Sequence, residues 1–366
     1  MPRPRVLINA LSLSDGGGRS YATNLLRELS RDDRGFRFCV LALPGTLDGL
    51  ETEGLEVQIA RPFPSPHALK GPMRVLYEQS VVPLHVRNFD LLYCIADVAP
   101  LLSASRCVLL CRNLNIYDRR WYDTARTRTL ARLGSLSMRR ARRVIFPSQA
   151  AVDAISALAS VPRERSRVIP YGVSLESFET GESPEVPGSY LFLPAAPERH
   201  KNIEVLIRCL PLLRNSETQA WIAGKSLIDF DHQHFLEDMA RSLGVAERVR
   251  FLGAVPYAEL PGYYRAARAL VFPSFIETFG HPLVEAMAAG TPVLASDIPT
   301  SHEVAGDAAL YFPVDAPEAL ARCVEALEAD PLATQERVAR GRERAERFDW
   351  GRSVDALCAV FEEALA

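Results

Sequence analysis

The sequence predicts an α/β protein built from two domains, each a doubly wound parallel sheet. Short β-rich runs alternate with helix-like runs along the whole chain, which is typical of parallel sheets. The chain has 366 residues, too many for one ordinary core and enough for two domains. Near the middle, the polar segment "ETGESPEVPGS" at 179–189 interrupts the alternation, which then starts again, so we expect the domain linker there.

In the first half, each short apolar run predicts a strand. "RVLINAL" reads as a buried strand and leads into the glycine-rich opening of a helix, "GGGRSYATNLLREL". That helix repeats apolar residues every four positions, at Tyr21, Leu25 and Leu29. Further strands are expected at "FRFCVLAL", "LEVQIA", "DLLYCI", "CVLLC", "RVIFPS" and "SRVIPYG".

The second half predicts strands at "YLFL", "AWIAG", "RVRFLG", "RALVFPS", "PVLAS" and "AALYF", again separated by helices. We expect a first domain at 1–178 and a second at 179–348. We also expect an amphipathic helix at 349–366 that packs back on the first domain. In such Rossmann-like domains, ligands lie where the carboxyl ends of strands meet the N-termini of helices.

Composition narrows the class of protein. The formal net charge of -3 gives no reason to expect a nucleic acid as partner. The seven cysteines are scattered without a CxxC pair, and Cys107 and Cys111 fall on one side of a strand-like run. Buried thiols in a reducing cytoplasm fit this pattern. No stretch approaches the roughly 18 apolar residues of a membrane span, so we expect a cytoplasmic protein.

The segment "SFIETFGHPLVEAMAAG" at 274–290 has the pattern of a binding site. A strand ends near Ser274, Pro282 suits the first turn of a helix, and Gly290 suits its end. The backbone N–H groups at 278–283 would then point out of the sheet edge with the positive end of the helix dipole behind them. Such a helix end attracts an anion or polar hydroxyl groups.

Two carboxylates flank this helix start. Glu277 would project at its mouth, and Glu285, one turn into the helix, can face the same side. Carboxylates beside an anion site make sense as acceptors for sugar or ribose hydroxyls. The alternative is a surface loop residue and a solvated helix face. The glycine and apolar residues of "ETFG" favour close backbone approach over solvent exposure.

The stretch "PSFIETFGHPLVEAMAAGTPVLASDIPTSHEVAGDAALYFPV" resembles the Glu-x7-Glu signature region of the retaining glycosyltransferases of family 4, which have the GT-B fold. The resemblance extends to "PAAPERHKNIEVLI", "RVRFLGAVPYAELPGYYRAARALVFPS", "VIPYGVSLESF" and "DGGGRSYATNLLREL". It covers nearly the whole chain and is loosest from about 50 to 140. It implies two Rossmann-like domains that face a central cleft.

The resemblance also implies roles for individual residues. Glu277 would contact hydroxyls of the transferred sugar, Glu285 would accept hydrogen bonds from the ribose, and Lys201 would neutralise the donor diphosphate. The remaining donor contacts would come from backbone groups and from one side chain beside them. These are Gly17, Gly18, Thr278, Phe279, Gly280, His281 and Leu283. His281 alternatively has only a structural hydrogen bond.

The sequence departs from the family pattern at two places. Where many relatives carry Gly-Arg, this chain has Ala195 and Ala196, so Arg199 or Lys225 would have to supply the missing positive charge. Where many relatives carry His-Asp, this chain has Arg112-Asn113. An arginine there can bind a phosphate, an acceptor or a sugar hydroxyl, or it can tie down a loop, but it cannot act as a general base.

Two further features leave alternatives. "DFD" at 229–231, beside His232 and His234, imitates a manganese motif, but an acidic helix N-cap explains it more simply, and no metal or other cofactor is expected. Residues 118–143 carry nine arginines against two aspartates, with apolar residues interleaved. This basic stretch indicates contact with the inner face of a membrane, an anionic acceptor, or simply a solvated basic face.

The resemblance implies a retaining transferase. It would move a hexosyl group of the mannose or glucose type from a nucleotide diphosphate sugar to a glycan or lipid-linked acceptor, in cell-envelope polysaccharide synthesis. Preorganised cations and N–H donors would stabilise the leaving diphosphate without a metal. The alternatives are an epimerase or phosphorylase of the same fold, and a scaffold that binds nucleotide sugars without catalysis.

Overall fold

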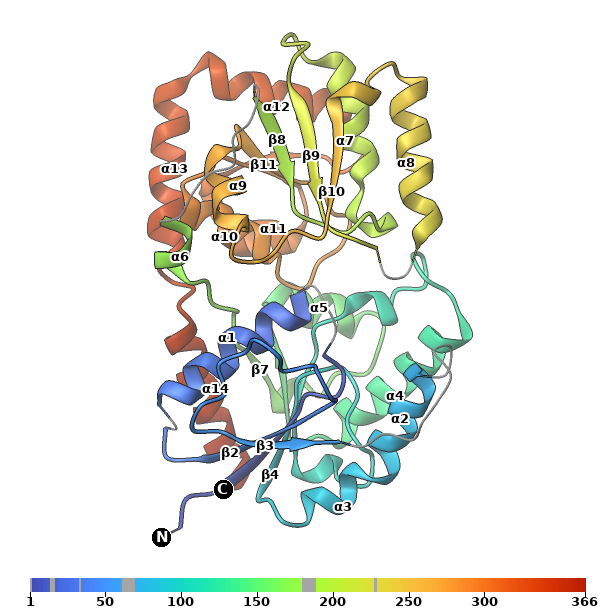
Figure 1. Ribbon diagram of the computed structural model, residues 1–366, viewed down its shortest axis with the longest axis vertical. Helices are drawn as coiled ribbons and strands as arrows, with labels where there is room; N and C mark the ends of the chain where they lie inside the picture. Colours follow the sequence, from blue (N-terminus) through green and yellow to red (C-terminus); the bar gives the residue numbers. More distant parts are fainter. Residues whose placement is uncertain (1, 14–16, 33, 61–69, 180–188, 227–228) are drawn as a thin grey trace. The chain divides into compact units, whose positions relative to one another are not determined.

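The computed structural model describes residues 2–13, 17–32, 34–60, 70–179, 189–226 and 229–366. The chain divides into two units, Met1–Gly172 with Trp350–Ala366 and Val173–Asp349 (Figure 1). The first boundary precedes the expected position 178, because α6 (Leu175–Glu179) packs on helices of the second unit. Of the linker expected at 179–189, positions 180–188 lie outside the described residues.

The first unit contains a parallel sheet whose seven described strands follow the order β3-β2-β1-β4-β5-β6-β7. In chain order these are β1 (Arg5–Asn9), β2 (Arg37–Ala42), β3 (Glu56–Ile59), β4 (Leu91–Cys94), β5 (Cys107–Leu110), β6 (Arg143–Phe146) and β7 (Ser166–Val168). The helices are α1 (Gly17–Arg31), α2 (Lys70–Ser80), α3 (Val82–Val86), α4 (Ala125–Arg140), α5 (Gln149–Ser156) and α14 (Trp350–Leu365).

The second unit repeats this architecture with six described strands in the order β10-β9-β8-β11-β12-β13. These are β8 (Tyr190–Leu193), β9 (Gln219–Ala223), β10 (Val249–Gly253), β11 (Ala269–Phe272), β12 (Val293–Ser296) and β13 (Ala309–Phe312). Its further helices are α7 (Ile203–Cys209), α8 (Phe230–Ser242), α9 (Leu260–Ala266), α10 (His281–Ala289), α11 (Pro299–Ala305), α12 (Pro317–Ala329) and α13 (Pro331–Ala345). The predicted pair of doubly wound domains is confirmed.

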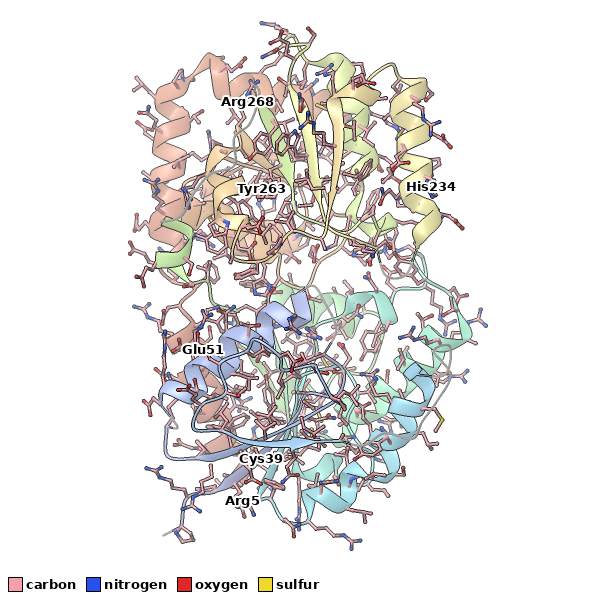
Figure 2. The ribbon with its side chains drawn as sticks, in the orientation of Figure 1. Arg5, Cys39, Glu51, His234, Tyr263 and Arg268 are labelled. Atoms are coloured by element: carbon pink, nitrogen blue, oxygen red, sulfur yellow. The ribbon has the colours of Figure 1, made fainter. Side chains whose placement is uncertain are left out.

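Stacked aromatic side chains stabilise the second sheet at β8 and β9. Tyr190 stacks on Trp221 with ring centroids 4.4 Å apart, and Phe192 stacks on Tyr263, which Figure 2 labels, at 5.8 Å. Such pairs add to the burial of large apolar areas. They hold β8 and β9 against α9, so the strand that leads to the candidate site is rigid.

The last helix, α14, belongs to the first unit and packs on α1, β4 and β5. Its Trp350 ring lies 5.6 Å from Tyr21 on α1, and Phe361 lies 5.3 Å from Tyr93 on β4. Gly172, where the chain leaves the unit, lies directly against the backbone of Trp350. The C-terminal segment therefore completes the core of a unit that begins more than three hundred residues earlier.

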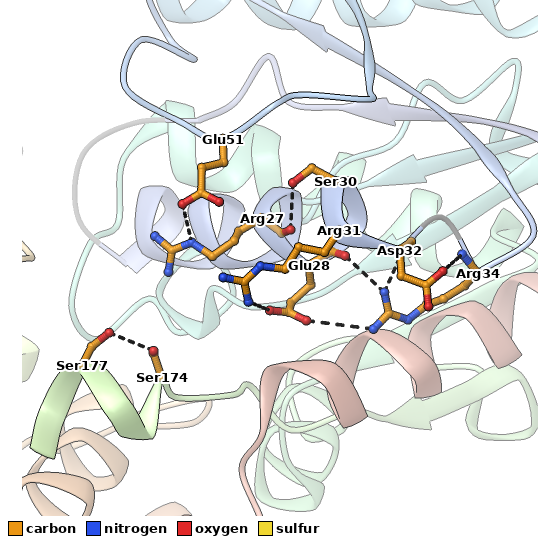
Figure 3. A network of polar contacts seen from close by, with 9 residues as sticks. All are labelled: Arg27, Glu28, Ser30, Arg31, Asp32, Arg34, Glu51, Ser174 and Ser177. Carbon is orange, nitrogen blue, oxygen red and sulfur yellow. Dashed lines mark hydrogen bonds and ion pairs between the residues drawn. The ribbon is translucent and has the colours of Figure 1, made fainter.

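The C-terminal end of α1 is fixed by charged side chains (Figure 3). Arg34, which has a positive φ of 48°, donates to the carbonyls of Glu28 and Asp32. The Nε of Arg34 also donates to Oδ1 of Asp355 on α14 at 2.6 Å. The Arg34 guanidinium therefore joins the last turn of α1 to α14.

Each sheet reverses its strand order beside its first strand. β1 lies between β2 and β4, and β8 lies between β9 and β11. In open parallel sheets, the crevice at the carboxyl ends of the strands at this reversal is where ligands bind. In the second unit, this position receives the loops that follow β8 and β11.

We predict that Gly172→Ala destabilises the first unit. A Cβ at this position would lie 2.5 Å from the Trp350 nitrogen and 2.6 Å from its Cα, so backbone would have to move. The expected loss is about 2 kcal/mol or more, measured by calorimetric unfolding. Gly71→Ala is the matched control, because only the end of Arg126 comes within 4 Å there, and alanine favours the helix. Equal stability of the two variants would contradict the packing described.

Candidate functional site

A lysine and a glutamate meet where the second sheet reverses its strand order. Lys201 follows β8, Glu277 follows β11, and the Lys201 Nζ donates to Glu277 Oε1. The Lys201 side chain is 22% exposed and that of Glu277 is 14% exposed, so solvent reaches both. The ion pair therefore stands at the position where this fold binds ligands.

The loop after β8 is locked by the residue that follows Lys201. Asn202 has a left-handed backbone with φ of 53°, and its buried side-chain amide donates to the carbonyls of Pro273, at 3.1 Å, and Val314, at 2.7 Å. The N–H of Phe275 donates to the carbonyl of His200 at 2.9 Å. These bonds tie the loops after β8 and β11 together on either side of Lys201.

The loop after β11 is pinned in the same way. Ser296 Oγ donates to the carbonyl of Ser274 at 2.7 Å, and Thr300 Oγ1 donates to the carbonyl of Glu277 at 2.9 Å. Ser274 Oγ also donates to Glu277 Oε1 at 3.1 Å. The Glu277 carboxylate is thus held on both its backbone and its side chain.

Gly280 starts α10 in a conformation that only glycine adopts readily. Its φ is 87°, and a Cβ there would lie 2.9 Å from Cζ of Phe272. Thr278 and Phe279 are buried, and the Phe279 ring packs edge-on against Phe348, at 5.6 Å, and against His281, at 5.5 Å. The backbone of the "ETFG" loop is therefore fixed before any ligand binds.

Leu283 differs from the prediction. Its N–H, expected to be free, donates to the carbonyl of Gly280 at 3.0 Å, and its side chain is fully buried. The reason is that the tight turn at Gly280 closes on the first turn of α10. The N–H of Leu283 is thus already bonded within the turn, and the donor contact predicted for Leu283 stays a prediction.

Glu285 lies in the interior of the second unit. The hydroxyl of Tyr264 on α9 donates to Glu285 Oε2 at 2.6 Å, and the side chain of Tyr257 also bonds it. Burial raises the pKa of Glu285 to about 7, although both tyrosine hydrogen bonds oppose the rise. A carboxylate can accept more than these two hydrogen bonds, so the ribose contact predicted for Glu285 stays a prediction.

Two titratable residues that the sequence did not single out surround Lys201. The pKa of Glu198 is raised above its ordinary value, mainly by burial. The charge of Lys201 opposes this rise, and the charges of Glu277 and Asp229 add to it. His200 is buried, and burial together with Lys201 holds its pKa well below the usual value, so it stays neutral. Lys201 is therefore the cation of a site that also holds the Glu198 and Glu277 carboxyl groups.

The structure separates the two suggested substitutes for the missing arginine. Arg199 forms an ion pair with Asp229, Nε to Oδ2 at 2.9 Å. Asp229 also caps α8, accepting the N–H of His232 at 3.2 Å, so the predicted N-cap is confirmed. Lys225, two residues beyond β9, is exposed, and its side chain forms no hydrogen bond or ion pair with another described residue. The adjacent Gly224 fits directly against the backbone of Ala195 and Ala196, where a Cβ would overlap main-chain atoms.

In the first unit, Arg112 is placed by a buried aspartate. Asp97, just beyond β4, accepts the N–H groups of Arg112 and Asn113, both at 2.9 Å on Oδ1. Burial raises the pKa of Asp97, and the N–H of Asn113 and the charge of Arg112 oppose the rise. Sequence reasoning missed Asp97, although its place after a strand at the carboxyl edge was a usable signal.

The Arg112 guanidinium lies over the first turn of α1. A Cβ on Gly18 would be 2.6 Å from Arg112 Nη2, so glycine makes room for this side chain. The charge of Arg112 also lowers the pKa of the buried Tyr21 and Tyr171, against the larger effect of burial. The structure thus brings Gly18 and Arg112 together. Gly17 is the first residue of α1. Residues 14–16 lie outside the described part of the chain.

The described residues contain no group of three histidine, cysteine or acidic side chains placed to hold a metal ion. None of their helices combines the length and the hydropathy needed to span a bilayer. The seven cysteines are free.

Comparison with known proteins identifies the type of chain. The family model described as "Glycosyl transferases group 1" matches residues 179–347, and "Glycosyltransferase Family 4" matches residues 15–177. A curated relative, the O-antigen chain mannosyltransferase RfbU of Salmonella typhimurium, is 31% identical over 215 residues, 59% of this chain and 58% of that protein. The D-inositol 3-phosphate glycosyltransferase of Thermobifida fusca is 31% identical over 232 residues, 59% of this chain and 53% of that protein. The matched part therefore spans little more than half the length of these relatives.

A similar solved structure supports the fold. Anabaena HepE in complex with UDP and glucose has a TM-score of 0.79 at 19% identity, covering 98% of this chain and all of that one. The sucrose-phosphate synthase of Thermosynechococcus elongatus has a TM-score of 0.80, also at 19% identity, with 99% of each chain covered. The predicted GT-B fold is confirmed.

We predict that Glu285 makes stability depend on pH. Its pKa is raised from 4.5 to about 7, so the folded protein binds a proton that the unfolded chain has lost between these values. Stability therefore falls as pH rises through this window, by on the order of 3 kcal/mol. Glu285→Gln should flatten the slope of unfolding free energy against pH from about 4.5 to about 7.5 in urea titrations. The exposed Glu336→Gln serves as control and should keep the wild-type slope. A Glu285→Gln variant that keeps the full slope would exclude this carboxyl group as its source.

Proposed function

This chain belongs to glycosyltransferase family 4, and from that premise we propose that it is a retaining hexosyltransferase. The donor is a nucleotide diphosphate sugar with a mannose- or glucose-type hexose. The acceptor is a glycan or a lipid-linked sugar of the cell envelope. Relatives named O-antigen chain mannosyltransferase and D-inositol 3-phosphate glycosyltransferase, and a HepE structure that holds UDP and glucose, support this choice of substrates.

The observation that carries the proposal is the Lys201–Glu277 pair at the strand-order reversal of the second sheet. A donor diphosphate replaces Glu277 as the partner of Lys201, because its two phosphoryl groups carry two negative charges and a carboxylate carries one. Glu277 is then free to accept hydrogen bonds from hydroxyls of the sugar. Ser274 remains bonded to the carboxylate and keeps it in place.

The chemistry needs little beyond this arrangement. When the bond between the anomeric carbon and the phosphate oxygen breaks, negative charge grows on the diphosphate and the sugar gains oxocarbenium character. Lys201 and the N–H groups of the "ETFG" loop stabilise that charge without a metal ion. The acceptor hydroxyl attacks from the face the diphosphate leaves, and a phosphate oxygen takes its proton, so configuration is retained.

We assign the second donor cation to Lys225. Arg199 is occupied by Asp229, whereas Lys225 is exposed beside the backbone that packs on Ala195 and Ala196. A lysine ammonium is a compact charge that suits a diphosphate. Lys225 follows β9, the neighbour of β8 in the sheet, and takes the place of the arginine that the family carries.

In the first unit, Arg112 is assigned to an anionic or hydroxyl-bearing part of the substrates. The basic stretch at 118–143 is the candidate for contact with an anionic acceptor or membrane. Asp118 and Asp123 neutralise only Arg120, at 2.6 Å, and Arg128, at 2.7 Å. The exposed Arg126 and Arg132 on α4 remain for such a partner.

The proposal is tested by thermal-shift measurements with UDP, GDP, ADP and their common sugar conjugates, with and without a chelator. A ligand at about 100 times its Kd adds roughly 2.7 kcal/mol to the stability of the unit that binds it. We expect one nucleotide family to stabilise the wild type and Lys201→Ala to lose that shift. Arg208→Ala removes an exposed positive charge from the same unit and should keep the shift.

The outcomes separate the alternatives. Turnover of the donor to an epimer without acceptor would indicate an epimerase, and binding without any transfer would indicate a scaffold. Absence of a shift with every nucleotide would overturn the proposal. A shift abolished by the chelator would exclude donor binding without metal.

We predict that Gly18→Ala lowers transfer without lowering stability. The new Cβ would displace the Arg112 guanidinium, which is the flexible end of a side chain, so folding loses little. A misplacement of about 1 Å in a binding group can reduce turnover by up to about 100-fold. We expect the turnover of Gly18→Ala and of Arg112→Lys to fall together, with Gly71→Ala as the unaffected control. Wild-type turnover of Gly18→Ala would show that the guanidinium position is irrelevant to transfer.

A further inference from the structure

A basic hollow lies at the amino edge of the first sheet, the edge opposite to Arg112. It has a volume of about 550 Å³. Arg5 begins β1, and Arg106 and Arg142 immediately precede β5 and β6. The strands β1, β4, β5 and β6 are consecutive neighbours in the sheet, so their starts lie side by side. Figure 2 labels Arg5 at this edge.

The charges in the hollow are unbalanced. Four arginines, Arg5, Arg87, Arg106 and Arg142, line it against one aspartate, Asp90. Asp90 accepts the backbone N–H of Arg5 at 2.8 Å. The lining therefore has an excess of three positive charges. The C-terminal end of α14 also borders the hollow, and its partial negative charge reduces this excess without cancelling it.

Among the described residues, Arg5 alone of these four arginines has a side chain with a structural partner. It pairs with Glu56 at 3.2 Å and lies over the Phe89 ring at 4.6 Å. The guanidinium groups of Arg87, Arg106 and Arg142 are exposed and form no hydrogen bond or ion pair with another described residue.

Glu363 on α14 does not balance the charges of these three arginines either. Glu363 is taken by Arg143, Nε to Oε2 at 3.0 Å, and by Arg167, Nη2 to Oε2 at 2.7 Å. Within the described part of the chain, Arg143 and Arg167 beside the hollow are thus paired with an acid. The three lining residues Arg87, Arg106 and Arg142 are not. Guanidinium groups that line one hollow without countercharge repel one another, and an anion that they share removes the repulsion.

We propose that this hollow binds an anion with two or more phosphoryl groups or an equivalent density of phosphate. Arginine recognises phosphate oxygens through paired N–H donors. A volume of about 550 Å³ is within the roughly 300–1,000 Å³ of small-molecule sites. Free polyphosphates and the headgroups of anionic lipids share this chemistry. The site is independent of the proposed transfer, because ligands of doubly wound sheets bind at the carboxyl edge.

The first arm of the test is calorimetric titration with inorganic tripolyphosphate at low salt. Because the proposed donor site also binds phosphates, the titration uses Lys201→Ala protein as the parent. We expect the parent to retain a site that weakens about 100-fold when Arg106→Ala and Arg142→Ala are combined, about tenfold for each guanidinium. The combined Arg106→Lys and Arg142→Lys variant keeps the charge but not the paired donors and should lie between them.

A matched control removes the same charge elsewhere. Arg208→Ala with Arg322→Ala takes two exposed arginines from the second unit, neither of which lines the hollow. This double variant should bind tripolyphosphate as the parent does. An equal loss in both double variants would show an effect of net charge alone and would overturn the proposal.

The second arm identifies a lipid source of the phosphate. Vesicles of phosphatidylcholine alone are compared with vesicles containing phosphatidylglycerol, using sedimentation. If anionic headgroups occupy the hollow, the Arg106 and Arg142 double variant loses binding to the anionic vesicles and Arg126→Ala with Arg132→Ala keeps it. The site is overturned if tripolyphosphate and anionic vesicles both fail to bind, or if both bind the hollow variant as well as its parent.

Discussion

The candidate site depends on one buried amide, Asn202. A parallel sheet brings the carboxyl ends of its strands to one edge, but this does not fix the loops that follow them. Asn202 does so, because it joins the loop after β8 to the carbonyls of Pro273 and Val314. Its left-handed backbone turns the chain between Lys201 and α7. Lys201 and Glu277 therefore meet on a backbone that is already rigid, which is the condition for a preorganised binding group.

The electrostatics of the second unit follow from this rigidity. Lys201 is held among carboxyl groups, and the neighbouring His200 is kept neutral by burial. The charge of Lys201 is thus balanced by Glu277. An incoming diphosphate exchanges that partner for a more strongly charged one. Since Ser274 also bonds the Glu277 carboxylate, the exchange does not leave a buried charge without hydrogen bonds.

Periodicity and turn residues in the sequence were enough to predict the strands and the helix with Pro282 in its first turn. They also placed Lys201 and Glu277 beyond their strands. They could not predict which side chains lie against a given helix face. The partners of Glu285, Tyr264 and Tyr257, come from another part of the chain, so its burial was not visible. The position of Asp97 after a strand was a signal, but the N–H groups that it accepts lie fifteen and sixteen residues later in the sequence. Tertiary partners, rather than local propensity, decide these contacts.

Arg106 in the hollow and Arg112 at the carboxyl edge lie at opposite ends of the same strand, β5. Arg106 precedes β5 and Arg112 follows it, and six residues of extended chain separate them by about 20 Å. This exceeds the Debye length of about 8 Å at physiological ionic strength. Because Arg106 is exposed to solvent, an anion in the hollow hardly changes the potential at Arg112. The unit can therefore hold a phosphate at its amino edge while the carboxyl edge keeps its own chemistry, and effects of changes at the two edges should add.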